Sequence, residues 1–307
     1  MIAPVWENAA ELVPYQDEPP QMPSAVVGKN GYLRLGFECR GDRTELIDIE
    51  RRVPLFAHKA LYWDEALPSM PCVMLITTTG GILQGDRLHL VVDMAPDTQA
   101  HLTTQSGTQV HSMDANYAAQ TQELILDENA YLEYIPDPIF PHSDARYYSH
   151  TQIKIAPSAT LIYAETLMPG RKYHKTGGEL FAYDVFSSRI SAQRPNGQEL
   201  MSEKFVIQPK QHDVRHVGQM ADFDVFGNVF LLTPKVNADH VFSQTPAFYD
   251  RELGLAAGAS RLPNDAGLVY RVLGYESQPV QAKIREFWSL VRQTVTGTAV
   301  MPAFLWR

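Results

Sequence analysis

Val92-Asp-Met-Ala-Pro-Asp-Thr-Gln-Ala-His-Leu102 is the first of three related segments, followed by Ile125-Leu-Asp-Glu-Asn-Ala-Tyr-Leu132 and Ile155-Ala-Pro-Ser-Ala-Thr-Leu161. In each segment one predicted strand ends, a short turn follows, and an alanine begins the next predicted strand. These alanines are 30 and 29 residues apart. Such regular spacing indicates stacked β layers, in which each unit buries the face of the previous one. Ordinary hairpins of a β-sandwich that share turn chemistry explain the spacing equally well.

Alternating apolar and polar residues surround these segments, and alternation with period two is typical of β-strands. Between residues 32 and 205 no helical stripe interrupts the pattern. The sequence therefore predicts a mainly β fold with stacked, solenoid-like layers. The expected strands cover residues 32–39, 72–77, 88–93, 99–104, 118–126, 130–135, 147–155 and 160–165.

Helical periodicity appears only near the C-terminus. Apolar residues from Val280 to Val295 recur at steps of three and four, with Pro279 before them and Gly297 after them. A helix is expected over residues 279–295, and a weaker one over 237–251. This small helical annex packs either on its own sheet or on a partner protein. Its candidate docking residues are Phe287, Trp288 and Arg292.

The overall charge limits the partners. The chain has 26 Lys and Arg residues against 35 Asp and Glu residues, a formal net charge of −9. Nucleic acid and anionic membranes would repel it. No apolar run reaches the length of a membrane span, about 18 residues. We therefore expect neither nucleic acid nor a membrane as a partner.

Cysteine usage and the first residues complete the domain prediction. The two cysteines, Cys39 and Cys72, are too few for a disulfide framework, which favours a reducing compartment such as the cytoplasm. Residues 1–24 are acidic, rich in proline and without Lys or Arg. They predict a flexible leader, followed by one β-rich domain over residues 25–307.

The segment from Thr79 to Arg87 has the spacing of a phosphate-binding loop but lacks its Lys-Ser/Thr pair and the following helix. This excludes nucleotide binding there. Glycines at 80, 81 and 85 instead predict a tight bend between two strands, with Asp86 and Arg87 at its exit.

Metal and catalytic signals are weak. His212 and His216 are four residues apart with Asp213 between them, a thin metal signature. Nucleophile-elbow, zincin and Cys-His motifs are absent. Carboxylates are scattered along the later strands, and their spacing fixes no acid-base pair.

Several motifs occur in the order in which one family carries them. They are Gly80-Gly81-x-x-x-Gly85-Asp86-Arg87-Leu88, Leu102-Thr103-Thr104, Ala130-x-Leu132-Glu133-Tyr134-Ile135-Pro136-x-Pro138, Gly170-Arg171, Gly178-Glu179, Arg271-Val272-Leu273-Gly274, Phe287-Trp288-x-Leu290-x-Arg292 and the closing Trp306. From about Arg34 to its end, the sequence resembles the urease accessory proteins of the D/H type. It departs from them at Gln84, where a glycine is common, and at Gln109 and His111-Ser112, where two basic side chains are lost.

The resemblance implies a non-enzymatic scaffold with a helix-poor β fold. Such proteins bind the F-type accessory protein, recruit the G-type GTPase through it and dock on apo-urease, so that nickel reaches the buried active site. It also implies no tightly bound cofactor, with Ni²⁺ in transit along an internal route. The acidic residues at matching positions are the candidates for that route: Asp86, Glu133, Glu165 and Glu203.

Two other functions remain open on the sequence alone. A β-solenoid hydrolase or lyase would use carboxylates such as Asp86 and Glu133 with Arg87 or Arg171, and it would show two carboxyl groups in an exposed groove. A bare interaction module would have neither a groove nor a channel. A nickel route would use oxygen ligands, because thiolate and imidazole clusters would trap the ion.

Overall fold

Two facing β-sheets form the body of the protein in the computed structural model, which describes residues 6, 9–17, 29–174 and 178–301. Sheet A has seven strands. From one edge to the other they are β14 (Glu199–Ile207), β13 (Val185–Gln193), β11 (Arg146–Ile155), β8 (Ala118–Leu126), β5 (Arg87–Met94), β1 (Asn30–Arg40) and β2 (Arg43–Arg52).

Sheet B has eleven strands. Its main order is β16 (Phe248–Asp250), β17 (Leu255–Arg261), β18 (Gly267–Gly274), β15 (Val225–Leu232), β12 (Thr160–Leu167), β9 (Tyr131–Tyr134), β6 (Gln99–Thr104), β4 (Cys72–Thr77) and β3 (Leu55–Ala57). Two short strands join it beside β12: β10 (Ile139–Pro141), which pairs with β12, and β7 (Thr108–Val110), which pairs with β10.

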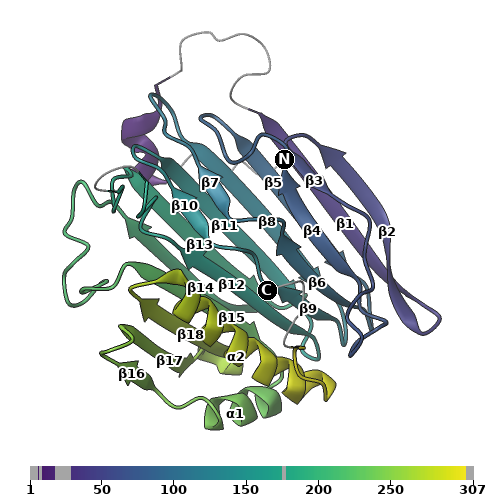
Figure 1. Cartoon of the computed structure of the whole chain (residues 1–307). Helices are drawn as coiled ribbons and strands as arrows, with labels where there is room; N and C mark the ends of the chain where they lie inside the picture. The colour runs from purple at the N-terminus through teal and green to yellow at the C-terminus, as the bar shows by residue number, and fades with distance from the viewer. Residues whose placement is uncertain (1–5, 7–8, 18–28, 175–177, 302–307) are drawn as a thin grey trace.

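From β4 to β13 the chain passes back and forth between the two sheets (Figure 1), except that β6 and β7, and likewise β9 and β10, follow one another within sheet B. Neighbouring strands are parallel from β1 through β5, β8 and β11 to β13 in sheet A, and from β4 through β6 and β9 to β12 in sheet B. The predicted mainly β fold with stacked, solenoid-like layers is therefore confirmed.

Small side chains mark the crossings between the layers. Ala100, Ala130 and Ala159, the three alanines of the sequence repeat, are at most 1% exposed and belong to the main core. Backbone bonds join successive repeats, from Tyr131 N to Thr98 O at 2.8 Å and from Thr160 N to Ala130 O at 2.8 Å. The spacing thus reflects parallel stacking of equivalent units.

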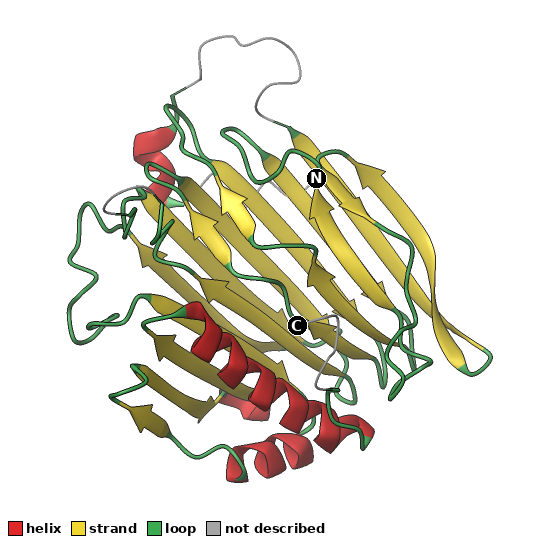
Figure 2. Cartoon of the chain, viewed as in Figure 1, coloured by secondary structure: helices red, strands yellow, loops and turns green. Residues whose placement is uncertain are grey.

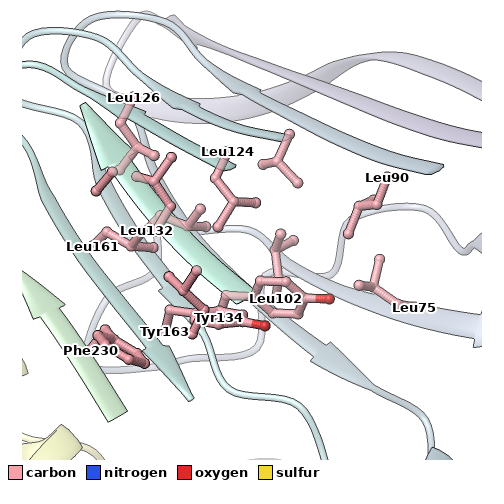
Figure 3. Packing of buried hydrophobic residues seen from close by; sticks show 14 of the residues in the cluster. Leu75, Leu90, Leu102, Leu124, Leu126, Leu132, Tyr134, Leu161, Tyr163 and Phe230 are labelled. Atoms are coloured by element: carbon pink, nitrogen blue, oxygen red, sulfur yellow. The ribbon is translucent and has the colours of Figure 1, made fainter. Parts of the chain in front are cut away.

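Leucines, valines and a few aromatic residues fill the space between the sheets. Figure 3 shows several of the leucines and aromatic rings from close by. They come from the inward positions of alternating strands, such as Leu124 and Leu126 on β8 or Leu161 and Tyr163 on β12. Burial of this apolar surface is the main force holding the two layers together.

Two helices cover the outer face of sheet B (Figure 2): α1 (Lys235–Ser243) and α2 (Ser277–Thr296). The α2 helix includes the expected range 279–295. The expectation of a helix over 237–251 is wrong beyond Ser243, because the chain continues into β16. Pro246 explains this difference, since proline cannot continue a helix and disfavours helical backbone in the residue before it.

Part of the predicted leader forms a helical turn. Residues Ala10–Tyr15 form a short 3-10 helix, η2, against the outer face of sheet A. Leu12 is fully buried there, and the Glu11 carboxylate accepts hydrogen bonds from Ser187 Oγ at 2.6 Å and Lys204 Nζ at 2.9 Å. The other leader residues lie mostly outside the described part of the chain. A second 3-10 turn, η3, covers Pro263–Asp265.

Helices long and apolar enough to span a membrane do not occur in the described part of the chain.

Candidate functional site

A cavity of about 420 Å³ lies between the two sheets. Its outer part is formed by the exposed Gln105 and Ser106 in the loop between β6 and β7, and its inner part by buried residues of β8, β11 and β12. The polar side chains of its wall are Thr77, Thr104, Gln105, Ser106, Thr108, Gln120, Gln122, Tyr134, Asp137, Tyr147, Ser149, Tyr163, Glu165 and Thr166.

A chain of hydrogen bonds links these walls across the sandwich. Tyr134 Oη donates to Gln122 Oε1 at 2.8 Å, and Gln122 Nε2 donates to Tyr163 Oη at 3.1 Å. Tyr163 Oη in turn donates to Glu165 Oε1 at 2.9 Å, and Ser188 Oγ lies 2.9 and 3.1 Å from the two oxygens of the same carboxylate. The chain ends on the carboxylate of Glu165, which is only 7% exposed.

The ionisable side chains of the described cavity wall are all acidic or phenolic. Its described wall contains two carboxylates, Asp137 and Glu165, and no Lys, Arg, His or Cys side chain. Burial raises the pKa of Glu165 above its usual value, hydrogen bonds from Tyr163 and Ser188 act in the opposite direction, and the nearby Glu203 carboxylate raises it further. A divalent cation beside Glu165 would offset this cost of burying negative charge.

Glu203, on β14 of sheet A, lies near enough to Glu165 for its charge to raise the pKa of that carboxyl group. Its carboxylate is 26% exposed and forms an ion pair with Arg271 of β18, at 2.6 Å. The pair joins sheet A to sheet B at the end of the sandwich that carries β14 and β18. Two of the four acidic residues expected along an internal route, Glu165 and Glu203, are therefore brought together.

Asp86 is not brought to the cavity wall. Its fully buried carboxylate accepts backbone hydrogen bonds from Lys29 N and Leu83 N, both at 2.9 Å. Burial raises its pKa, and the two backbone bonds oppose that change. In the structure Asp86 closes the bend before β5 and is not among the residues of the cavity wall.

Glu133 faces away from the cavity, toward α2. Its carboxylate accepts hydrogen bonds from Arg292 Nε at 2.7 Å, Arg292 Nη2 at 2.6 Å and Tyr131 Oη at 2.6 Å, and it bonds His101 Nδ1 at 2.9 Å. Burial alone would raise its pKa, but the bonds from His101 and Arg292 outweigh burial and lower the pKa to about 2. The Glu133 carboxylate is thus part of a buried ion cluster and does not line the cavity.

Arg292 is the centre of that cluster and is completely buried, where it also binds Asp64. Phe287 and Trp288 are 3% and 4% exposed. Phe287 stacks on Tyr270 of β18 with ring centroids 4.5 Å apart, while Trp288 stacks on His101 at 5.0 Å. In the structure, the three residues predicted for partner docking are buried and attach α2 to its own sheet.

The remaining motif residues have local structural roles. Gly80, Gly81 and Gly85 have positive φ angles of 72°, 152° and 76°, which other residues rarely adopt, so they form the expected bend. Arg87 donates to Tyr117 O at 2.7 Å and to Asn116 Oδ1 at 2.8 Å.

Gly80 and Thr104 belong to the cavity wall, whereas Arg171 does not. Thr104 Oγ1 accepts a hydrogen bond from Asp137 N at 2.9 Å and belongs to the cavity wall. Arg171 forms a two-point ion pair with Glu179. Trp306 lies outside the described residues.

Gln109 and His111, two of the positions where the sequence departs from the motifs named above, lie next to His142. Gln109 Oε1 accepts a hydrogen bond from His142 Nε2 at 2.8 Å, and the rings of His111 and His142 are 4.8 Å apart. Burial, followed by the charge of Arg171, lowers the pKa of His142 to about 4. This imidazole is therefore uncharged near neutral pH.

His212 and His216 lie in the loop between β14 and β15. Across the described residues, no three His, Cys, Asp or Glu side chains come together in a way that could hold a metal ion. The His212 and His216 pair therefore remains a weak candidate without a third ligand in the described chain.

The hydrolase alternative finds no support. Asp86 belongs to the turn that precedes β5 of sheet A, whereas Glu133 lies under α2 on the outer face of sheet B. Both side chains are fully buried, and their oxygens are bonded to groups of the protein. A glycosidase needs a substrate-accessible pair of carboxyl groups, and these two do not form one.

Most of the polar cavity wall is not apparent from sequence motifs. Gln120, Gln122, Tyr134, Tyr147 and Tyr163 fall within the expected strands, but no motif marks them as a site. The sequence feature that could have indicated them is a polar residue at a strand position that faces the core. Gln120 and Gln122, for example, share a face of β8 with the apolar Leu124. A buried glutamine needs a partner, so a run of two predicts a polar interior.

Comparisons with known proteins fit this architecture. The family model described as UreD urease accessory protein matches residues 29–307. Urease accessory protein UreD 2 of Brucella suis biovar 1 (strain 1330) is 54% identical over 299 residues, which cover 97% of this chain and 99% of the relative. Urease accessory protein UreD of Photorhabdus laumondii is 51% identical over 300 residues, covering 98% and 93%. The chain therefore belongs to the UreD family of urease accessory proteins.

Proposed function

We propose that this chain acts in urease maturation as a non-enzymatic scaffold, and that Ni²⁺ passes through the cavity between its sheets on the way to apo-urease. The observation that carries the transit role is the composition of the cavity wall, which combines two carboxylates with hydroxyl and amide groups and lacks described basic side chains. Family membership supports the accessory role.

The ligand chemistry favours passage over storage. A relay must bind a divalent ion strongly enough to admit it and weakly enough to release it. Oxygen donors meet this requirement better than thiolate or imidazole, which bind Ni²⁺ more tightly. Neither Cys39, which is exposed, nor Cys72, which is buried, belongs to the cavity wall.

We place this work in the cytoplasm, in a complex with the F-type accessory protein, the G-type GTPase and apo-urease. The support for these partners is the resemblance of the sequence motifs to the D/H-type accessory proteins. The net charge of −9 also agrees with partners that are neither nucleic acid nor anionic membrane.

Co-expression of urease and its accessory proteins with and without this chain tests the proposal. With the chain, we expect urease to contain nickel and to be active, and we expect the chain to elute with the F-type protein in size-exclusion chromatography. Without it, urease should accumulate as nickel-poor apoprotein. Equal nickel content in the two preparations would refute the accessory role.

A further inference from the structure

Asn228, in the middle of β15, has an unusual environment. Its side chain is 0% exposed, and neither Nδ2 nor Oδ1 has a hydrogen-bond partner among the described residues. Buried amides are almost always paired, because an unpaired polar group loses its bonds to water without replacement. The amide of Asn228 therefore needs a partner that the described side chains do not supply.

The strand register places this amide beside the cavity. Asn228 lies directly opposite Glu165 of β12 on one side and Arg271 of β18 on the other. Figure 1 shows β15 between these two strands. Glu165 bonds Ser188 and Arg271 bonds Glu203, both on sheet A, so this row of residues faces the interior of the sandwich. Asn228 is therefore one strand beyond the inner wall of the cavity.

The chemistry around Asn228 selects a small cation. Side chains on directly opposed residues have Cβ atoms about 4.5–5.5 Å apart. A carboxylate and an amide oxygen at that separation can both reach one small divalent ion, whose oxygen ligands stand about 2.1 Å away in the case of Mg²⁺. The Glu165 carboxylate accepts its hydrogen bonds from the hydroxyl groups of Tyr163 and Ser188, which carry no positive charge. The charge of Arg271 is balanced by Glu203.

We infer that Glu165 and Asn228 together form an oxygen-donor site for a hydrated divalent cation at the inner end of the cavity. The identity of the ion as Ni²⁺ rests on the proposed function. The row continues from this site to the ion pair of Glu203 and Arg271, whose side chains are 26% and 50% exposed. The site thus lies between the cavity and a second, partly exposed edge of the sandwich.

Two substitutions with opposite expected effects test this inference. Asn228→Leu removes both the orphan amide and the oxygen ligand, so the metal-free protein should unfold about 2–4 °C higher while its Ni²⁺ affinity falls about tenfold. Asn228→Asp keeps an oxygen ligand and adds a buried charge. It should bind Ni²⁺ at least as tightly as the wild type and unfold at a lower temperature without the metal.

The measurements are equilibrium dialysis of the full-length protein against Ni²⁺ and thermal unfolding without metal. Asn196→Leu, at an exposed position in the turn between β13 and β14, is the control for unspecific effects. The inference is overturned if Asn228→Leu binds Ni²⁺ like the wild type, or if it unfolds at a lower temperature. Should Asn228→Leu fail to fold, loss of Ni²⁺ binding in Asn228→Asp overturns the inference instead.

The two proposals fail differently. If the wild-type chain does not raise the nickel content of urease, the transit function is wrong whatever Asn228 does. If the wild type binds Ni²⁺ and Glu165→Gln weakens binding while Asn228→Leu does not, the route stands and only the assignment of Asn228 is wrong.

Discussion

Replacing Arg292 by methionine is expected to lower the free energy of unfolding by about 3–5 kcal/mol. The substitution leaves the carboxylates of Glu133 and Asp64, 0% and 1% exposed, without their shared cation. A buried charge without a partner incurs its full cost of desolvation. Urea denaturation of the purified chain measures the effect, with Gln281→Met on the exposed side of α2 as the control.

The same cluster predicts how stability depends on pH. The pKa of Glu133 in the folded protein is about 2, below its usual value of 4.5. Its contribution to stability is therefore complete above pH 4.5 and is lost as the pH falls toward 2.

In the double variant Arg292→Met, Glu133→Gln, the loss of stability should be smaller than the sum of the two single losses. A change below about 1 kcal/mol for Arg292→Met alone would show that the cluster does not hold α2 in place.

Replacing Glu165 by glutamine is expected to reduce urease activation by about tenfold to a hundredfold. The change removes the one buried carboxylate of the described cavity wall but keeps the size of the side chain. Bonds to charged groups contribute about 1.5–3 kcal/mol, which corresponds to that change in cation occupancy. The measurement is the activity of urease co-expressed with the variant, at equal amounts of chain.

Glu50→Gln is the matched control, because Glu50 is exposed on β2, outside the cavity wall. It should activate urease like the wild type. Tyr163→Phe removes the hydroxyl that donates to Glu165 and should have a smaller effect than Glu165→Gln. Full activation by Glu165→Gln, with normal levels of folded chain, would rule out a role for this carboxylate in metal passage.

The layered fold could be predicted because its signal is repeated. Three alanines at nearly equal spacing indicated the stacking of parallel units, and the apolar periodicity from Val280 to Val295 predicted α2. The helix expected over 237–251 was wrong beyond Ser243 because its pattern was weak and Pro246 interrupts it. Which strands pair, and that the helices cover sheet B, depends on contacts between residues far apart in the sequence.

The site was harder to predict, because a strand residue has two possible faces. Glu133 follows Leu132 and precedes Tyr134, so alternation already places it on the face opposite to theirs. Glu165 shares its face with Leu161 and Tyr163, which point into the core. Alternation thus separates the two glutamates, but it does not reveal that α2 covers one face and a cavity lies behind the other. The position of the Asp86 side chain is set by the geometry of a loop, and no periodic sequence pattern predicts that geometry.

The proposed passage of nickel through the cavity is tested most directly by blocking the cavity. Thr77 lies in the cavity wall at the end of β4 and is partly exposed, so Thr77→Trp places a bulky side chain there. The control is Ile47→Trp, at a position on β2 that is 39% exposed. The measurement is the nickel content per urease active site after maturation with each variant, for chains that fold and bind their partners normally. We predict a nickel content close to that obtained without the chain for Thr77→Trp and a normal content for Ile47→Trp. A normal nickel content with Thr77→Trp would contradict the account.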